Sequence, residues 1–125
     1  MSYTNTDHTI DLASSKLSFE EFRSLIISDY RLAVASRQVS LLGRKEVLTG
    51  KAKFGIFGDG KELAQIALSK VFRDGDWRSG YYRDQTMSLA LGFTDEYKFF
   101  SQLYATPDLD IEPASGGRQM NCHFS

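Results

Sequence analysis

Tyr82 and Arg83 are the residues whose types and spacing best suit the binding of an anion. They stand directly before Asp84, which we interpret as the cap of a predicted helix. A guanidinium group and a phenol at a helix N-terminus, where free backbone amides point outward, form an anion site. Arg78 is close enough in sequence to add positive charge. A second interpretation, a surface arginine beside a packed tyrosine, fits the same residues.

The segment 55–62, Gly-Ile-Phe-Gly-Asp-Gly-Lys-Glu, nearly matches the phosphate-binding P-loop pattern G-x-x-x-x-G-K-[ST]. Its last position is Glu62, which lacks the hydroxyl group that binds magnesium and would repel a phosphate. No buried strand rich in Val and Ile precedes the segment. The pattern therefore favours a glycine-rich loop that enters a helix.

Cys122, His123 and His8 carry the remaining side chains that often act as ligands or nucleophiles. One cysteine excludes an internal disulfide and a cysteine-based zinc site within this chain. His123 has no carboxylate or cysteine set at ligand spacing, so we expect no metal site. We expect Cys122 and His123 to be packed or exposed residues and His8 to be inert.

The hydrophobic pattern predicts a mainly helical chain with about four helices and few strands. Ser18-Phe19-Glu20-Glu21 matches a capping box, so the longest helix is expected from Ser18 to Leu42, with Gly43 just after its end. Residues 43–60 contain five of the ten glycines and should form an irregular connection. Shorter helices are expected at residues 60–73, at residues 84–91 and from Thr94 onward, the last with Tyr97, Phe100, Leu103 and Tyr104 facing inward. A short extended segment is expected at residues 77–83.

The composition limits the classes of protein to which the chain can belong. Its 125 residues, 42% of them hydrophobic, suffice for one domain with a hydrophobic core. The 15 basic and 16 acidic residues leave a net charge of −1, whereas proteins that bind the nucleic-acid backbone usually have a strong basic excess. No run approaches the roughly 20 apolar residues of a membrane span, and the N-terminus has neither a basic start nor an apolar stretch. We therefore expect a soluble, cytoplasmic chain that binds neither nucleic acid nor a membrane.

Three motifs follow one another along the chain: Gly60-Lys61-Glu62-Leu63-Ala64, Tyr82-Arg83-Asp84 and Gly117-Arg118-Gln119-Met120. The first resembles the Gly-Gln-Glu-Ala helix start, and the second the Tyr-Arg-Asp-His segment, of the α subunit of the thiamine diphosphate-dependent decarboxylase component of 2-oxoacid dehydrogenase complexes. The third is more similar to the Gly-Arg-Gln-Met of branched-chain 2-oxoacid enzymes than to the Gly-Gly-Ser-Met-His of pyruvate enzymes. Residues 18–125 thus resemble the N-terminal part of such an α subunit, or of a fused α–β chain.

The resemblance implies roles for four residues. Tyr82 and Arg83 match the pair that contacts the cofactor diphosphate, so the resemblance favours the anion site over the packed surface pair. Phe54 matches an aromatic residue on the substrate side of the active site. His123 matches the terminal histidine of its motif, with a packing role as the alternative. Tyr81 departs from the family, which often has Gln or a similar polar residue there.

For the whole protein, the resemblance implies an α/β thiamine diphosphate-binding fold that oxidatively decarboxylates a branched-chain 2-oxoacid and transfers the acyl group to lipoyl groups. Residues 1–16 would be a flexible lead-in, and residues 17–125 an incomplete N-terminal portion of the cofactor-binding α domain. Thiamine diphosphate and Mg²⁺ are the implied cofactors. The resemblance implies that the metal ligands lie beyond residue 125. Gly58-Asp59-Gly60 is similar to the start of the family's metal motif, but the asparagine downstream, Asn121, is too distant to complete that motif here. The implied partners are a β subunit or β domain, a lipoyl-bearing acyltransferase and a 2-oxoacid substrate, within an oligomer.

Two other functions fit parts of the sequence. A stand-alone helical interaction module without catalysis would need only the predicted helices. A nucleotide-binding P-loop protein would bind ATP with magnesium and lose that binding on Lys61→Ala, and we expect no such binding.

Overall fold

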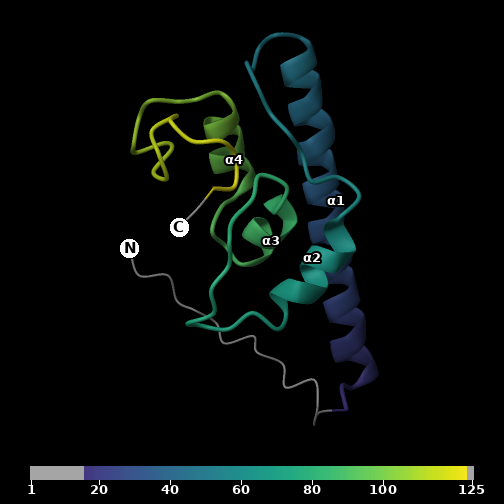
Figure 1. Ribbon diagram of the computed structural model, residues 1–125. Coiled ribbons are helices and arrows are strands. Elements are labelled where there is room, and N and C mark those ends of the chain that lie inside the picture. The colour runs from purple at the N-terminus through teal and green to yellow at the C-terminus, as the bar shows by residue number, and fades with distance from the viewer. Residues whose placement is uncertain (1–15, 124–125) are drawn as a thin grey trace.

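The structure is a computed structural model that describes residues 16–123 and contains four helices in that range. They are α1 (Phe19–Leu48), α2 (Glu62–Ser69), α3 (Gln85–Ala90) and α4 (Glu96–Leu103). Long α1 forms one side of the molecule, and α2, α3 and α4 each pack against it (Figure 1). No strand occurs within residues 16–123, so the mainly helical prediction is confirmed. The lead-in predicted for residues 1–16 lies outside the described residues, except for Lys16. In the described part of the chain, no helix has the length and apolar character needed to cross a bilayer.

Helix α1 begins as predicted but ends later. The Ser18 hydroxyl accepts the Glu21 N–H at 3.3 Å, and the Glu21 carboxylate accepts the Ser18 N–H at 2.8 Å, which completes the capping box. The helix then passes through Gly43 and ends at Leu48. Gly43 is buried in the helix because the Phe57 ring packs directly on it, leaving no room for a Cβ atom. The prediction of Gly43 as a helix end was therefore wrong: the glycine permits a close approach.

The contact between α1 and α3 is polar, although it is fully buried. The Gln85 side-chain amide donates to the Ser36 carbonyl at 2.7 Å and to the Ser40 hydroxyl at 2.9 Å. The hydroxyls of Ser36 and Thr86 are 2.7 Å apart. None of these four residues is more than 1% exposed. We call them the polar interface; its directional bonds fix α3 on α1 at one register.

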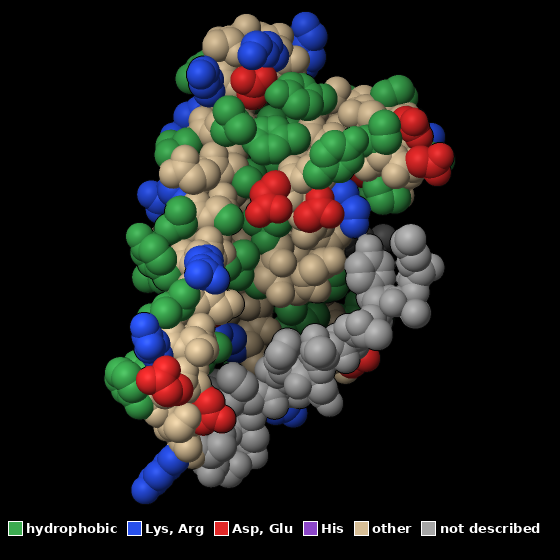
Figure 2. All heavy atoms as spheres, turned by 180° about the vertical axis from the view of Figure 1, so that it is seen from behind, with side chains coloured by type: hydrophobic (Ala, Val, Ile, Leu, Met, Phe, Trp, Pro, Cys, Tyr) green, Lys and Arg blue, Asp and Glu red, His purple; other side chains and the backbone are tan. Residues whose placement is uncertain are grey.

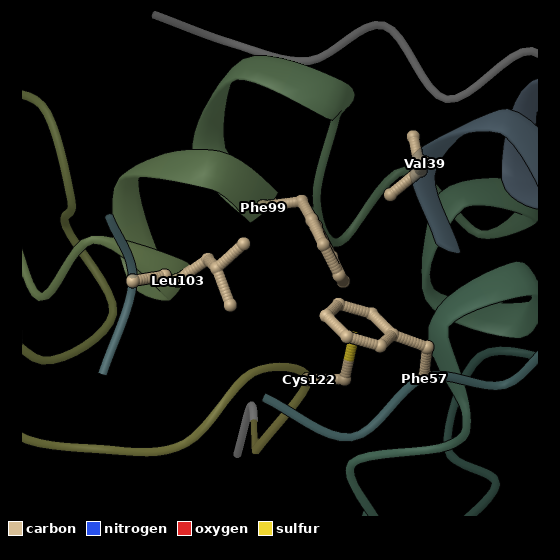
Figure 3. Close-up of a cluster of buried hydrophobic side chains, with 6 residues drawn as sticks. Val39, Phe57, Phe99, Leu103 and Cys122 are labelled. Atoms are coloured by element: carbon tan, nitrogen blue, oxygen red, sulfur yellow. The ribbon is translucent and has the colours of Figure 1, made fainter. Parts of the chain in front are cut away.

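A second buried region joins α1, the glycine-rich connection, α4 and the C-terminal segment (Figure 3). We call it the apolar cluster; its members are Val39, Ala52, Phe57, Phe99, Leu103 and Cys122. The rings of Phe57 and Phe99 lie 6.2 Å apart, in the range of favourable aromatic contacts. The cluster thereby holds the segments before α2 and after α4 against the same helix.

The inward face of α4 differs from the predicted one. Phe99 and Leu103, four residues apart, are buried, whereas Tyr97 is 67% exposed. Phe100 is only partly buried, and Tyr104 points its hydroxyl at the buried Glu46 carboxylate, 2.7 Å away. The prediction was wrong for Tyr97 because two turns of helix allow several apolar stripes, and packing selects among them.

Helix α2 is shorter than the predicted span of residues 60–73. Gly60 has a φ of 91°, which excludes it from a right-handed helix. The helix ends at Ser69, with Lys70 as its C-cap. Residues 77–83 contain no strand and lead irregularly into the turn before α3.

Candidate functional site

The turn before α3 carries Tyr82 and Arg83. It closes through a 3.0 Å hydrogen bond from the Asp84 N–H to the Tyr81 carbonyl. The Tyr81 and Tyr82 hydroxyls are hydrogen-bonded to each other, which raises the pKa of Tyr81. The Arg83 guanidinium carbon lies 5.4 Å from the centre of the Tyr82 ring. Since α3 has only six residues, its dipole is small, and an anion at this turn would depend on the guanidinium and the phenols.

The backbone of Arg83 is held from two sides. The Gln65 side-chain amide donates to the Arg83 carbonyl at 2.7 Å and accepts the Met87 N–H at 3.0 Å, so it ties the turn to α3. Gly58 packs against the same carbonyl so closely that a Cβ atom would overlap the Arg83 oxygen. Both contacts limit the positions that the guanidinium can reach.

The sequence suggested that Arg78 adds positive charge to this turn, but the charge of Arg78 is neutralised by an ion pair. Its side chain is 9% exposed and forms a 3.0 Å ion pair with Asp84. Asp84 occupies the N-cap position of α3 but makes no side-chain cap hydrogen bond; its carboxylate instead accepts from Arg78 and from the Tyr81 N–H at 3.0 Å. The helix-cap interpretation of Asp84 was therefore wrong, because a buried guanidinium is the stronger donor. By contrast, no described carboxylate lies within ion-pair distance of Arg83.

Phe54 borders a cleft of about 210 Å³ next to this turn. Tyr82 lines the same cleft, together with residues 117–121. Residues 55 and 56 line both this cleft and a second hollow of about 350 Å³, which Arg83 borders. The structure therefore places Phe54, Tyr82 and Arg83 around two adjoining hollows that share one stretch of backbone.

His123 lies beside Tyr82, with the two ring centres 6.2 Å apart. Its Nδ1 atom is 3.1 Å from the Asn121 carbonyl and 3.3 Å from the Met120 carbonyl. A carbonyl can only accept, so these contacts assign the proton to Nδ1 and leave Nε2 as an acceptor in the neutral ring. His123 is half-buried and does not line the cleft itself.

A loop built around Glu112 delivers residues 117–119 to the cleft. The Glu112 carboxylate is 1% exposed and accepts the backbone N–H groups of Ala114, Ser115 and Gly117 at 2.9 to 3.0 Å. Burial disfavours its ionised form, but these donors and the Ser115 hydroxyl outweigh burial and lower the pKa of Glu112. Gly117 has a φ of 76° and packs on the Ala105 carbonyl with no room for a Cβ atom, so this position requires glycine.

Cys122, for which the sequence left packing and exposure open, is fully buried and anchors the end of the described chain. Its N–H donates to the Gln102 side chain at 3.2 Å, and the Asn121 side chain donates to the Phe99 carbonyl at 3.0 Å. Burial raises the pKa of the Cys122 thiol to about 12, so the thiol is neutral and unreactive at neutral pH. Residues 121–122 thus fix His123 relative to α4.

The turn at residues 58–61 offers no free site to a phosphate. The Glu62 carboxylate accepts the Gly60 N–H at 3.0 Å and two bonds of 2.6 and 2.9 Å from Arg37. These bonds from Arg37 lower the pKa of Glu62 to about 2, so a negative charge fills the turn at neutral pH. Among the residues that the structure describes, no group of three or more His, Cys, Asp or Glu side chains is placed to hold a metal ion.

Comparison with known proteins shows that the chain is similar to a curated relative. The chain is 36% identical over 100 residues to the 2-oxoisovalerate dehydrogenase subunit alpha of Bacillus subtilis (strain 168). This match supports the family that the ordered motifs indicated. The alignment covers 76% of this chain but 28% of that subunit, so the chain spans little more than a quarter of its relative. No family model matches the chain, and no solved structure matches it significantly.

Gln65 and Glu112 are the residues that sequence reasoning missed at this site. Gln65 stands directly before Ile66, and a polar residue on the buried side of a short helix is the one signal that could have marked it. Glu112 lies in an irregular segment between two prolines, where nothing in the sequence indicates a buried carboxylate. Both side chains form hydrogen bonds with backbone groups of other residues. A pattern of residue types does not indicate such contacts, because every residue has a backbone.

Proposed function

We propose that residues 17–125 form the N-terminal portion of the thiamine diphosphate-binding α domain of a branched-chain 2-oxoacid dehydrogenase. The main support is the 36% identity to 2-oxoisovalerate dehydrogenase subunit alpha. The proposed reaction is oxidative decarboxylation of a branched-chain 2-oxoacid, with acyl transfer to a lipoyl group. It would take place in a cytoplasmic oligomer with a β subunit or β domain and a lipoyl-bearing acyltransferase.

Arg83 is proposed to pair with the diphosphate of the cofactor. Its planar guanidinium fork suits the geometry of phosphate oxygens, and its backbone is fixed by Gln65 and Gly58. Tyr82 would add a hydroxyl group to the same anion. When bound, thiamine diphosphate supplies the electron sink for decarboxylation. We propose that the Mg²⁺ ligands lie beyond residue 125.

Phe54 and His123 are proposed to face the substrate. Phe54 is 55% exposed at the border of the cleft, which suits an apolar wall for a branched aliphatic chain. His123 would use its free Nε2 atom as a hydrogen-bond acceptor. Its Nδ1 atom is occupied by backbone carbonyls, so the ring is already oriented.

The cofactor role of Arg83 is tested in the complete enzyme that contains this chain, assembled with its β partner. Arg83→Gln should weaken thiamine diphosphate binding by about 10- to 150-fold, equivalent to about 1.5–3 kcal/mol, measured by calorimetry with Mg²⁺ present. Arg73→Gln, an exposed arginine outside the site, is the matched control and should leave affinity unchanged. Unchanged affinity in Arg83→Gln would show that this residue does not hold the diphosphate.

The substrate role of Phe54 is tested by steady-state kinetics in the same complex. Phe54→Ala should raise the KM for a branched 2-oxoacid several-fold and alter the KM for pyruvate less, because the lost contact serves the branched chain. Thiamine diphosphate affinity should stay within about twofold of the original, since one lost apolar contact away from the diphosphate leaves the charged contacts intact. Equal changes for the two substrates would assign Phe54 to structure and not to specificity.

A further inference from the structure

The cleft that Phe54 borders is lined by basic residues and by no described acidic residue. Lys53 lines it from the glycine-rich connection, and Arg118 lines it from the loop built around Glu112. None of its lining residues within the described chain is Asp or Glu. Elsewhere on the surface the two signs are mixed: acidic and basic side chains lie next to one another at several places on the face shown in Figure 2. The charge that lines the cleft is therefore positive.

Neither of these two cations forms an ion pair with another described residue. The arginines that do form ion pairs in the described part of the chain are Arg23, Arg37, Arg44 and Arg78. The side chains of Lys53 and Arg118 are also exposed, so a dissolved anion can reach them. An anion that entered the cleft would meet two cations without competition from a described carboxylate.

The Arg118 side chain is oriented by Ser115. Its Nε atom donates to the Ser115 carbonyl at 2.8 Å, and its backbone N–H donates to the Ser115 hydroxyl at 3.1 Å. Ser115 is 7% exposed and donates its hydroxyl to the Glu112 carboxylate at 2.7 Å. Since Nε is occupied, the two terminal nitrogens of the guanidinium remain as a pair of donors. Such a pair binds the two oxygens of a carboxylate at once.

A buried amide of the same cleft also lacks an acceptor. Gln102 lines the cleft and is 4% exposed. Its Oε1 atom accepts the Cys122 N–H at 3.2 Å, whereas its Nε2 atom has no hydrogen-bond partner among the described residues. A buried donor without a partner is unfavourable, so an oxygen atom of a ligand would be favoured beside it.

The cleft also has apolar walls, and it is small. Aliphatic and aromatic side chains form part of its lining: Phe54, Ile56, Leu103 and Met120. Its volume of about 210 Å³ lies below the roughly 300–1,000 Å³ of sites for drug-sized ligands. We propose that the cleft binds a short monocarboxylic acid, with the carboxylate paired to Arg118 and the hydrocarbon chain against Phe54. Within the proposed function, on which this assignment rests, that acid is the 2-oxoacid substrate.

The diphosphate of the cofactor fits this cleft less well. Arg83, proposed to pair with the diphosphate, does not line the cleft but borders the adjoining hollow of about 350 Å³. Each hollow therefore has an arginine without a described ion pair. This separation favours a phosphate group at Arg83 and a carboxylate at Arg118.

The first test uses the 125-residue chain without cofactor. A branched 2-oxoacid, 3-methyl-2-oxobutanoate, is titrated into isotopically labelled chain, and NMR follows the Arg118 Nε–H and the Gln102 side-chain amide. Both signals should shift. The acid should bind at least tenfold more tightly than its uncharged analogue 3-methyl-2-butanone, and more tightly than inorganic phosphate. Arg118→Gln should weaken binding at least tenfold, whereas Arg73→Gln, an exposed arginine that does not line the cleft, should leave it unchanged.

The second test uses steady-state kinetics of the complete enzyme that contains this chain. CO₂ is uncharged, so an ion pair to the carboxylate stabilises the bound substrate more than the transition state of decarboxylation. Arg118→Gln should therefore raise the KM for the branched 2-oxoacid at least tenfold without lowering kcat. Arg118→Lys should restore part of the lost affinity. Thiamine diphosphate affinity should stay within about twofold of the original, because the diphosphate is assigned to Arg83.

Four results would overturn the proposal: no binding of the acid to the chain, equal or tighter binding of the ketone or of phosphate, unchanged binding in Arg118→Gln, or a fall in kcat with KM unchanged. Circular dichroism verifies that Arg118→Gln remains folded. Failure of the proposed function gives a different result. In that case the chain still binds the acid through Arg118, but the complete enzyme does not decarboxylate it.

Discussion

The polar interface and the apolar cluster hold opposite sides of the candidate site by different means. The polar interface positions α3, and with it the turn that carries Arg83, through hydrogen bonds of 2.7 to 2.9 Å. The apolar cluster holds the segment that leads to His123 through the packing of Phe57, Phe99 and Cys122. Hydrogen bonds are directional, whereas apolar burial depends mainly on area and volume. The side of the site that carries Arg83 is thus held in one register by hydrogen bonds. The side that carries His123 is held by the packing of apolar side chains.

This contrast predicts the largest loss of stability in the apolar cluster. Phe99→Ala should lower the free energy of unfolding by about 3–5 kcal/mol, because Phe99 is 0% exposed and its removal leaves a cavity. Urea denaturation measures the change. Tyr97→Ala in the same helix is the control and should cost less than about 0.5 kcal/mol, since its ring is mostly exposed. Similar losses in the two variants would contradict the observed face of α4.

The polar interface should yield the next largest effect. Gln85→Leu keeps the side-chain volume roughly constant but leaves the Ser36 carbonyl and the Ser40 hydroxyl without their donor. The expected loss is about 2–3 kcal/mol in the free energy of unfolding, again measured in urea. Gln38→Leu, on the exposed side of α1, serves as the control. Should Gln85→Leu be neutral or stabilising, the bonds would not define this interface.

Acid should weaken the ion pair that joins α1 to α2. The folded pKa of Glu62 is about 2 against an ordinary value of 4.5, so its ion pair with Arg37 stabilises the fold above about pH 4.5. That contribution is lost as the pH falls toward 2. We expect it to be about 1–2 kcal/mol at neutral pH, after allowance for solvent around the half-exposed Arg37.

The measurement compares the unfolding free energies of the original chain and of Glu62→Gln between pH 6 and pH 2.5. Subtracting the two curves removes the titration of Glu46 and Glu112, whose pKa values are also lowered. The difference should shrink steadily below pH 4.5. A difference independent of pH would show that the ion pair does not stabilise the fold.

The smallest expected effect concerns the chemical modification of Cys122 in the unsubstituted chain. Cys122 in the apolar cluster should react with iodoacetamide at least ~100-fold more slowly at pH 8 in the folded chain than in urea, because burial removes both access and thiolate. Mass spectrometry follows the modification. Phe99→Ala should accelerate the reaction more than Gln85→Leu, since only the former opens the cluster directly. The reverse order would place Cys122 in the region governed by the polar interface.

The sequence predicted the elements better than their contacts. The capping box at Ser18 and the four helices were predicted correctly because each depends on local chemistry and on the periodicity of apolar residues. Gly43 was misinterpreted, since its requirement comes from Phe57, fourteen residues further along. For the same reason, nothing in a residue pattern revealed that Asp84 pairs with Arg78.

The candidate site was predicted in part. Phe54, Tyr82 and Arg83 were selected from motif order, and the structure gathers them around adjoining hollows, while their chemical roles remain predictions. The supporting contacts of Gln65 and Glu112 could not be predicted, because they are made to backbone groups whose positions depend on the folded chain.

The contact between Gly58 and the Arg83 carbonyl makes these hollows mechanically dependent on each other. The backbone at Gly58 packs directly on the backbone at Arg83. Residues 54–58 therefore cannot shift toward the turn without displacing Arg83. The Gln65 amide holds that carbonyl from a second direction and resists its escape. The absence of a side chain at Gly58 therefore couples the two hollows. A molecule that displaces the backbone next to Phe54 should also change the position of the Arg83 guanidinium.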